Sequence, residues 1–332
     1  MGSSEVRFLF LRTGQVLTSA YKHVKTPWVH PTDAPPIEQS VHDFIVSAFR
    51  RQTDFRRNVE IIPISPGAEA KRGWDAAILE AVPLYLQYKL PNFSSRPHEH
   101  HKVASAVRKQ WHFHDVDGLF NFRLRKQAEH EPRSQHELLV ELADMGHRVY
   151  YVAPTFVDFK RLRRGADLLH NEAYLDGRIS IQHRNHLEQV YAPIFRDLIC
   201  IPPHCNVNGL PERHRFYYNF EHEVSLHSDP TMVPSLNFQD VYFDQLETIQ
   251  GEDTVTSENV EEYSIRVLKS LVGGRHANEA DFEQTSLYFE SHRRALLEAR
   301  GTNNLMASLR ALSQTVWVMT GVQVLLTVKK RW

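Results

Sequence analysis

The hydrophobic residues of this chain recur with the periods of helices and of strands, and the two patterns alternate along the first two thirds of the sequence. Apolar side chains three and four positions apart predict an amphipathic helix over residues 37–52. A Ser-x-x-Glu capping box that starts at Ser134 predicts a second helix over 134–145, which Gly146 ends. Short apolar segments bounded by turn residues predict strands over residues 6–11, 58–65, 149–156, 199–201 and 322–329. This alternation indicates an α/β fold.

The last third of the chain has a different pattern. Helical periodicity predicts helices over residues 257–272, 279–299 and 303–318. The preceding stretch is acidic and weakly patterned. We therefore expect three parts, an α/β domain over residues 1–227, a linker or irregular segment over 228–256 and a helical C-terminal region over 257–332. The apolar face of the first C-terminal helix predicts that this region associates with a second copy or with a partner protein.

The most informative segment is predicted to form two strands, residues 75–79 and 84–90, joined by a tight turn. Since side chains alternate along a strand, Gln87 and Lys89 would share one face. Burying an ammonium group without a partner is costly. A polar pair in an otherwise apolar strand therefore needs partners.

Acidic residues before this strand can supply them. Asp75 lies opposite Gln87 or Lys89, depending on where the turn is centred, and directly opposed residues have Cβ atoms about 5 Å apart. Glu69 precedes Asp75 by six residues and can reach the same patch. Carboxylates and a side-chain carbonyl are ligands for Mg²⁺ or Mn²⁺, with waters completing the shell. With an ammonium beside the metal, the set is suited to phosphodiester hydrolysis.

Asp75 followed by Gln87-x-Lys89 resembles the motif of the PD-(D/E)xK nuclease superfamily, and the Gln variant is similar to the Mrr-like restriction endonucleases. The resemblance covers roughly residues 37–160. It implies a restriction-endonuclease-like core, a mixed central sheet flanked by helices, with the Asp on the second core strand and Gln-x-Lys on the third. It also implies a Glu on the first core helix, for which Glu38 and Glu69 both qualify.

The resemblance implies a metal-dependent endonuclease that hydrolyses DNA, with Asp75, Gln87 and Glu69 as ligands of Mg²⁺ or Mn²⁺ and Lys89 as the cation that orients the attacking water. It further suggests prokaryotic antiviral defence. The alternative is a catalytically inactive nuclease fold that binds nucleic acid or scaffolds a complex, because Gln87 stands where an acidic ligand is common. DNA versus RNA, and single versus double strands, stay open.

Other groups of residues are weaker candidates for a site. Glu69-Ala-Lys71 and Asp158-Phe-Lys160 also match the short motif, but neither lies in an apolar strand. The cluster His98-Glu-His100-His101 suggests zinc or a solvated loop, and the loop is favoured. Gln135 and His136 either face the predicted site or form a plain helix start, and the plain helix start is favoured.

Charge and hydropathy add little to this picture. The formal net charge is −1, with basic clusters at Arg50–Arg57 and Lys160–Arg164 that suit either phosphates or a solvated helix face. No apolar run is long enough to span a bilayer, and the start lacks a signal-peptide pattern. We therefore expect a cytoplasmic protein that does not enter a membrane.

Overall fold

The computed structural model describes residues 38–51, 59–64, 78–94, 118–127, 133–157, 197–204, 207, 210–227, 231–249, 254–273, 290, 294 and 305–330. All of them belong to the unit that spans Asp33–Trp332. The strand expected over 6–11, most of the helix expected over 279–299 and the cluster at His98–His101 lie outside the described residues. Asp75 and Glu69 lie outside them as well.

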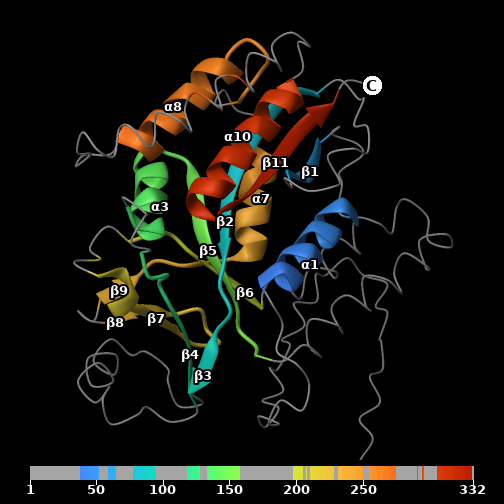
Figure 1. The fold of residues 1–332 in the computed structure, drawn as a ribbon. Helices are drawn as coiled ribbons and strands as arrows, with labels where there is room; N and C mark the ends of the chain where they lie inside the picture. Colours follow the sequence, from blue (N-terminus) through green and yellow to red (C-terminus); the bar gives the residue numbers. More distant parts are fainter. Residues whose placement is uncertain are drawn as a thin grey trace, which may run out of the picture. The chain divides into compact units, whose positions relative to one another are not determined.

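Within the described ranges, the larger of two sheets has six strands in the order β1-β11-β2-β5-β6-β10 (Figure 1). They are β1 (Val59–Ile64), β2 (Ile78–Tyr88), β5 (Arg148–Pro154), β6 (Leu198–Ile201), β10 (Leu236–Asn237) and β11 (Gln323–Lys330). The pair β2–β5 is parallel and the other pairs are antiparallel. The expected mixed sheet in an α/β fold is confirmed.

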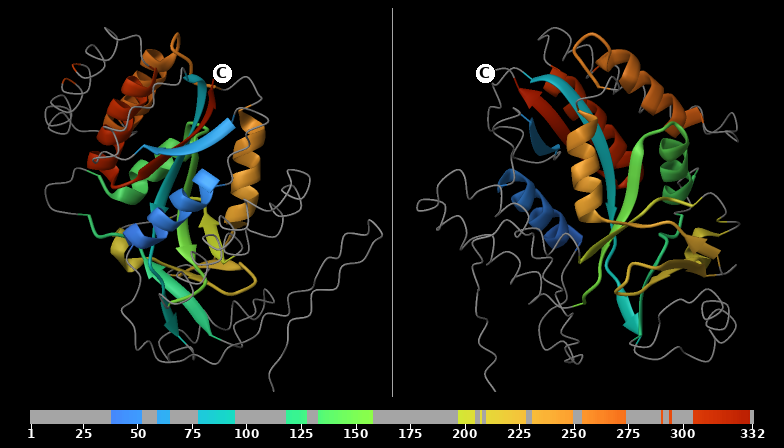
Figure 2. Two further views of the ribbon diagram at one scale, coloured as in Figure 1. Left: turned by 90° about the vertical axis from the view of Figure 1, so that its right-hand side faces the viewer. Right: turned by 180° about the vertical axis from the view of Figure 1, so that it is seen from behind.

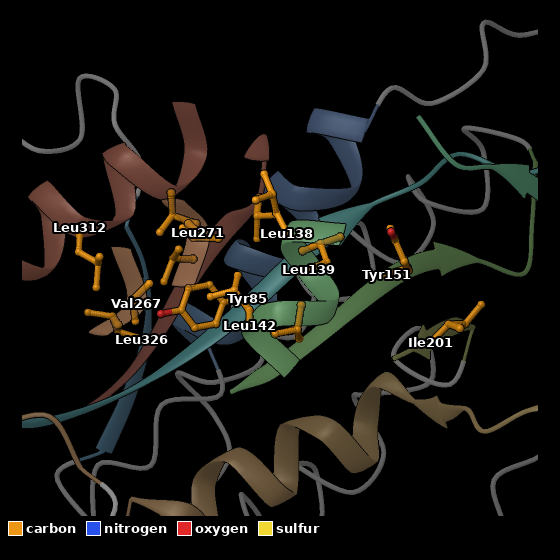
Figure 3. Packing of buried hydrophobic residues seen from close by; sticks show 14 of the residues in the cluster. Tyr85, Leu138, Leu139, Leu142, Tyr151, Ile201, Val267, Leu271, Leu312 and Leu326 are labelled. Carbon is orange, nitrogen blue, oxygen red and sulfur yellow. The ribbon is translucent and has the colours of Figure 1, made fainter. Parts of the chain in front are cut away.

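Helices cover both faces of this sheet, as the two views in Figure 2 show. On one face lie α3 (Gln135–Asp144), α8 (Val260–Gly273) and α10 (Leu305–Thr320); on the other lie α1 (Glu38–Arg51) and α7 (Phe238–Thr248). The alternation along β2 explains this division, because Tyr85 packs in the first cluster and Leu84 and Leu86 pack in the second. Figure 3 shows the first cluster, in which leucines of α3, α8 and α10 surround Tyr85.

A second sheet of five antiparallel strands packs into the same core. Its order is β3-β4-β7-β8-β9 among the described residues, with β3 (Asn92–Ser94), β4 (Leu119–Arg123), β7 (Arg215–Tyr218), β8 (Val224–His227) and β9 (Thr231–Val233). A short 3₁₀ helix, Pro211–Arg213, precedes β7. Phe122 of β4 and Phe216 of β7 join the cluster that contains Tyr85, so the two sheets share one hydrophobic core.

The predicted hairpin between residues 75 and 90 is wrong, because β2 is one strand of eleven residues through the position of the expected turn. Pro83 suggested a break, since a proline donates no hydrogen bond to a neighbouring strand. The strand continues because β11 pairs along it from Ile78 to Leu86. On its other side β2 changes neighbours near Pro83, from a bridge between Ala81 and Val255 to the parallel strand β5.

A single continuous β2 leaves no geometric basis for placing Asp75 opposite Gln87. Ile78 and Gln87 are the first and tenth residues of one strand, and a rise of about 3.3 Å per residue separates them by roughly 30 Å. Gln87 is instead registered beside Tyr151 of β5.

The C-terminal third does not stand apart from the rest of the core. The helices expected over 257–272 and 303–318 and the strand expected over 322–329 are confirmed as α8, α10 and β11. However, β11 lies between β1 and β2 in the larger sheet. The segment 228–256, expected as a linker, carries β9, β10 and α7. The acidic residues of this segment obscured its helical apolar pattern in the sequence. The helix α7 nevertheless has a short apolar face that packs against the sheet, formed by Phe238, Val241 and Tyr242.

The apolar face of α8 that suggested association is buried in this chain's own core, with Val267, Leu268 and Leu271 among the covered residues. That face therefore gives no support to an oligomer contact. None of the helices in the described ranges is long and apolar enough to cross a membrane.

Candidate functional site

Gln87 and Lys89 lie at the carboxyl end of β2, on the face covered by α3. Both are buried, with 6% and 8% of their surfaces exposed. Tyr88, between them, packs on the opposite face with α1. The prediction that Gln87 and Lys89 share one face is confirmed by their common neighbour, Gln135 of α3.

Gln135 joins the two residues through its side-chain amide. Lys89 Nζ donates to Gln135 Oε1 at 3.3 Å, and Gln135 Nε2 donates to Gln87 Oε1 at 2.9 Å. The same Nε2 donates to the backbone carbonyl of Thr320, the last residue of α10. A buried polar group without a partner costs about 1–3 kcal/mol. The hydrogen bonds of Gln135 therefore allow the amide of Gln87 and the ammonium of Lys89 to be buried at the end of β2.

Gly321 makes room for this network. After α10 ends, Gly321 adopts a positive φ of 67°, and its N–H donates to the carbonyl of Trp317 at 2.7 Å. A Cβ at this position would lie 3.2 Å from Gln135 Nε2. Glycine therefore meets two requirements here, the left-handed backbone and the close approach to Gln135.

The helix start that carries Gln135 is formed by the predicted capping box. Ser134 Oγ accepts from the backbone N–H of Glu137 at 3.2 Å, and Glu137 Oε2 accepts from the N–H of Ser134 at 2.7 Å. Both donors lie at the helix start, where backbone N–H groups have no intrahelical partners. The capping box therefore fixes the position of the first turn beside the end of β2.

The ammonium of Lys89 lies 5.7 Å from the centre of the Tyr151 ring, and the backbone N–H of Lys89 donates to the carbonyl of Val152 at 2.9 Å. Burial lowers the pKa of Lys89 from its usual value; the charge of Glu38 opposes that change and the charge of Arg125 adds to it. An ammonium whose hydration has been replaced by fixed partners interacts more strongly with an anion than a surface lysine does.

Glu38, at the start of α1, is the acidic residue whose charge acts on Lys89. Its side chain is exposed, yet the protein around its carboxyl raises its pKa, and the positive charge of Lys89 opposes that rise. Glu38 is therefore one described candidate for the carboxylate of this site. Glu69, the other candidate for the same role, is outside the described residues.

His136 follows Gln135 in α3 and contacts Tyr151, the residue whose ring lies beside the Lys89 ammonium. Its Nε2 donates to the backbone carbonyl of His204 at 2.9 Å, so its Nδ1 accepts from the hydroxyl of Tyr151 at 2.7 Å. Burial lowers the pKa of His136 to about 4, and the imidazole is neutral at pH 7. Gln135 and His136 thus both point into the protein from the first turn of α3. This placement agrees with the interpretation in which the two residues face Gln87 and Lys89, and not with a plain helix start.

A divalent cation would find only part of its donor set among the described residues. Mg²⁺ and Mn²⁺ prefer one or two carboxylates together with neutral oxygens and waters. Gln87 supplies a neutral oxygen and Glu38 a nearby carboxylate, while Asp75 and Glu69 lie outside the described ranges. Among the residues that the structure describes, no group of three or more His, Cys, Asp or Glu side chains could hold a metal ion.

Several residues of the site escaped the sequence interpretation. Tyr151 looked like an ordinary strand residue, and Arg125 and Gly321 carried no motif. The one available signal for Gly321 was its place three residues after the end of a predicted helix.

No protein-family model, curated protein or solved structure matches this chain. Any function must therefore be argued from the residues themselves.

Proposed function

We propose that this chain is a metal-dependent nuclease that hydrolyses phosphodiester bonds of DNA, with Lys89 as its catalytic cation. The observation that carries the proposal is the buried ammonium of Lys89 at the end of a central strand, held by Gln135 beside the oxygen of Gln87. Among the described residues, no carboxylate forms with Lys89 the close ion pair that usually accompanies a buried cation in a purely structural role. An anionic substrate would supply that negative charge.

Each side chain would have a separate task in this reaction. The Lys89 ammonium would contact a phosphoryl oxygen and stabilise the negative charge that grows there in the transition state. Gln135 and the Tyr151 ring restrict where Nζ can move, so the cation is oriented before the substrate binds.

The metal ligands of this proposal are Gln87 and the carboxylates of Glu38 and Glu69. A bound Mg²⁺ or Mn²⁺ would supply a nucleophilic water and offset charge on the phosphoryl oxygen. Glu38 is supported by its electrostatic interaction with Lys89. Glu69 is supported by the resemblance of the motif alone. Asp75 is not included, because β2 holds Ile78 roughly 30 Å from Gln87 and three residues span at most about 11 Å.

The assay combines metal dependence with carboxylate variants. Plasmid, linear duplex and single-stranded DNA are incubated with the full chain in Mg²⁺, in Mn²⁺ and in excess chelator. We expect cleavage with either metal and none with chelator. At least one of Glu38→Gln and Glu69→Gln should lose activity, because the proposal needs a carboxylate from one of these residues. Glu80→Gln, which alters an acid paired with Lys329 at the other end of β2, serves as the control. Undiminished cleavage in chelator would overturn the mechanism.

The second candidate function is a nuclease fold that binds nucleic acid without cutting it. It is favoured by Gln87, whose oxygen already accepts a hydrogen bond from Gln135. It predicts DNA binding with no cleavage in either metal, and the same assay with a binding measurement separates it from the first.

A further inference from the structure

We propose that Arg123, Arg125 and Lys126, with Arg215 beside them, form a phosphate-binding surface that leads a nucleic-acid backbone to Lys89. We call these four residues the basic strip. The inference rests on the proposed function in one respect, that the ligand is a nucleic acid. It adds the surface that would hold the substrate, the part of the substrate that is contacted, and the expectation that recognition is independent of sequence.

The first observation is the way in which the strip presents its charges. Arg123, Arg125 and Lys126 are exposed, while Leu124 between them is buried in the main core. The backbone N–H of Leu124 donates to the carbonyl of His214 at 3.3 Å. The segment after β4 is thus anchored by one apolar side chain and one backbone bond, and its cationic groups reach into solvent. Such an arrangement keeps charges in place without burying them.

The second observation is a like-charge pair in the sheet. Arg123 of β4 is registered directly opposite Arg215 of β7, on the same face of an antiparallel pair. Directly opposed like charges destabilise a sheet. Arg215 Nη1 donates to Asn121 Oδ1 at 2.8 Å, a neutral acceptor. Within the described part of the chain, no carboxylate forms an ion pair with Arg123, Lys126 or Arg215. An anion bound between the guanidinium groups would relieve the repulsion.

The third observation connects the strip to the candidate site. Phe122, which directly precedes Arg123, packs against the ring of Tyr151 with 5.8 Å between the ring centroids, and the Lys89 ammonium lies 5.7 Å from the centre of the same ring. The start of the strip is therefore joined to the proposed catalytic cation through one shared ring, although the strip follows a strand of the second sheet and Lys89 follows a strand of the first. A chain of phosphates that contacts the strip would bring one of its members toward Lys89.

The chemistry of these groups selects the backbone of the nucleic acid. Guanidinium groups bind phosphate oxygens through paired N–H donors, and lysine does so as a point charge. Contacts of this type position a nucleic acid and carry no sequence information. Each phosphate neutralised releases counterions, so affinity should fall steeply with salt.

The test is equilibrium binding in excess chelator, so that no metal-dependent cleavage interferes. Fluorescein-labelled duplex and single-stranded DNA are titrated with the full chain at several NaCl concentrations. The test variant is Arg123→Gln/Arg125→Gln/Lys126→Gln. The matched control, with the same loss of charge, is Arg266→Gln/Lys269→Gln/Lys329→Gln, which changes cations on α8 and β11. Circular dichroism checks that both are folded.

We expect the test variant to bind duplex at least tenfold more weakly at 0.1 M NaCl. Its slope of log K against log [NaCl] should be smaller by roughly 2–3, since each phosphate that the variant no longer neutralises removes about 0.9 from the slope. The control should bind within threefold of the parent. The variant Arg123→Lys/Arg125→Lys, in which Lys126 is unchanged, should also stay within about threefold, because the charge is kept.

Three results would overturn the inference: a parent chain that does not bind DNA, a test variant that binds like the parent, and a control that weakens as much as the test variant. Failure here is separable from failure of the proposed function. If the test variant still cleaves DNA and binds it as tightly as the parent, the basic strip is not the binding surface, but the proposed nuclease activity stands. If binding depends on the basic strip but no metal supports cleavage, the binding surface stands and the proposed nuclease activity is wrong.

Discussion

The ammonium of Lys89 lies 3.3 Å from Oε1 of Gln135, a residue 46 positions further along the chain. The contact exists because β2 ends beside the first turn of α3, which the capping box of Ser134 fixes. It ties the candidate cation of the site to a helix terminus rather than to a loop. The stability of the fold and the proposed chemistry of the site would therefore depend on the same side-chain amide.

Replacing Gln135 by leucine should weaken both the fold and the site. The change leaves the Lys89 ammonium and the Thr320 carbonyl without their buried partner, and the expected decrease in the free energy of unfolding is about 1–3 kcal/mol. Urea titration of the parent and of Gln135→Leu measures it. The control is Gln314→Leu on the exposed side of α10, which should change stability by less than about 0.5 kcal/mol. Equal stability of Gln135→Leu and the parent would show that the network carries no stability.

The two glycines Gly321 and Gly146 form a natural comparison. Both have positive φ, 67° and 84°, but a Cβ would meet Gln135 at Gly321 and open space at Gly146. Each alanine substitution should cost about 1–2 kcal/mol from backbone strain. Gly321→Ala should cost more than Gly146→Ala and should also reduce any nuclease activity, because it displaces the Gln135 amide. Thermal unfolding and cleavage assays on both variants decide the matter; identical behaviour would contradict the role given to Gly321.

The buried imidazole of His136 predicts a loss of stability in acid. Burial lowers the pKa of His136 to about 4, below the unfolded value near 6.5, so the unfolded chain binds the proton more readily. The corresponding stability is fully present above pH 6.5 and is lost as the pH falls toward 4. Burial also lowers the pKa of His147 to about 4, so His147 adds to the same loss of stability in acid.

Urea titrations at pH 7.5 and 5.0 test this linkage. The parent should lose more stability between the two pH values than either His136→Gln or His147→Gln, because each variant lacks one of the groups that takes up a proton on unfolding. If the parent and both variants lose the same amount, the two imidazoles are not the source of the pH dependence.

The sequence predicted the local elements of this fold better than their neighbours. The capping box of Ser134, the alternation along residues 84–88 and the helical periodicity of α8 each depend on residues close in the chain, and each is confirmed. The hairpin was wrong because the true partner of β2 is β11, more than two hundred residues away, and no local pattern encodes that pairing. For the same reason the C-terminal region looked separable although it supplies an interior strand of the larger sheet.

The residues of the candidate site were likewise predicted from a local pattern, whereas their partners were not. Gln87 and Lys89 were found because a polar amide and an ammonium interrupt an apolar strand, and their burial agrees with that interpretation. The partner expected for them was an aspartate across a turn; the partner observed is Gln135 with Tyr151 behind it. Which side chains meet at the end of a strand depends on tertiary packing, which the spacing of residues along the sequence does not contain.

The most direct measurement is the cleavage rate of Lys89→Met compared with that of Lys329→Met. Methionine keeps the apolar stem of Lys89 and removes the charge, and Lys329 is a partly exposed lysine paired with Glu80. In the metal that supports the fastest cleavage, Lys89→Met should cut DNA more than a hundredfold more slowly, which corresponds to about 3 kcal/mol less transition-state stabilisation. Its DNA affinity should stay within about threefold, and Lys329→Met should cut within about twofold of the parent. A folded Lys89→Met variant that cuts DNA as fast as the parent would contradict the assignment of Lys89 as the catalytic cation.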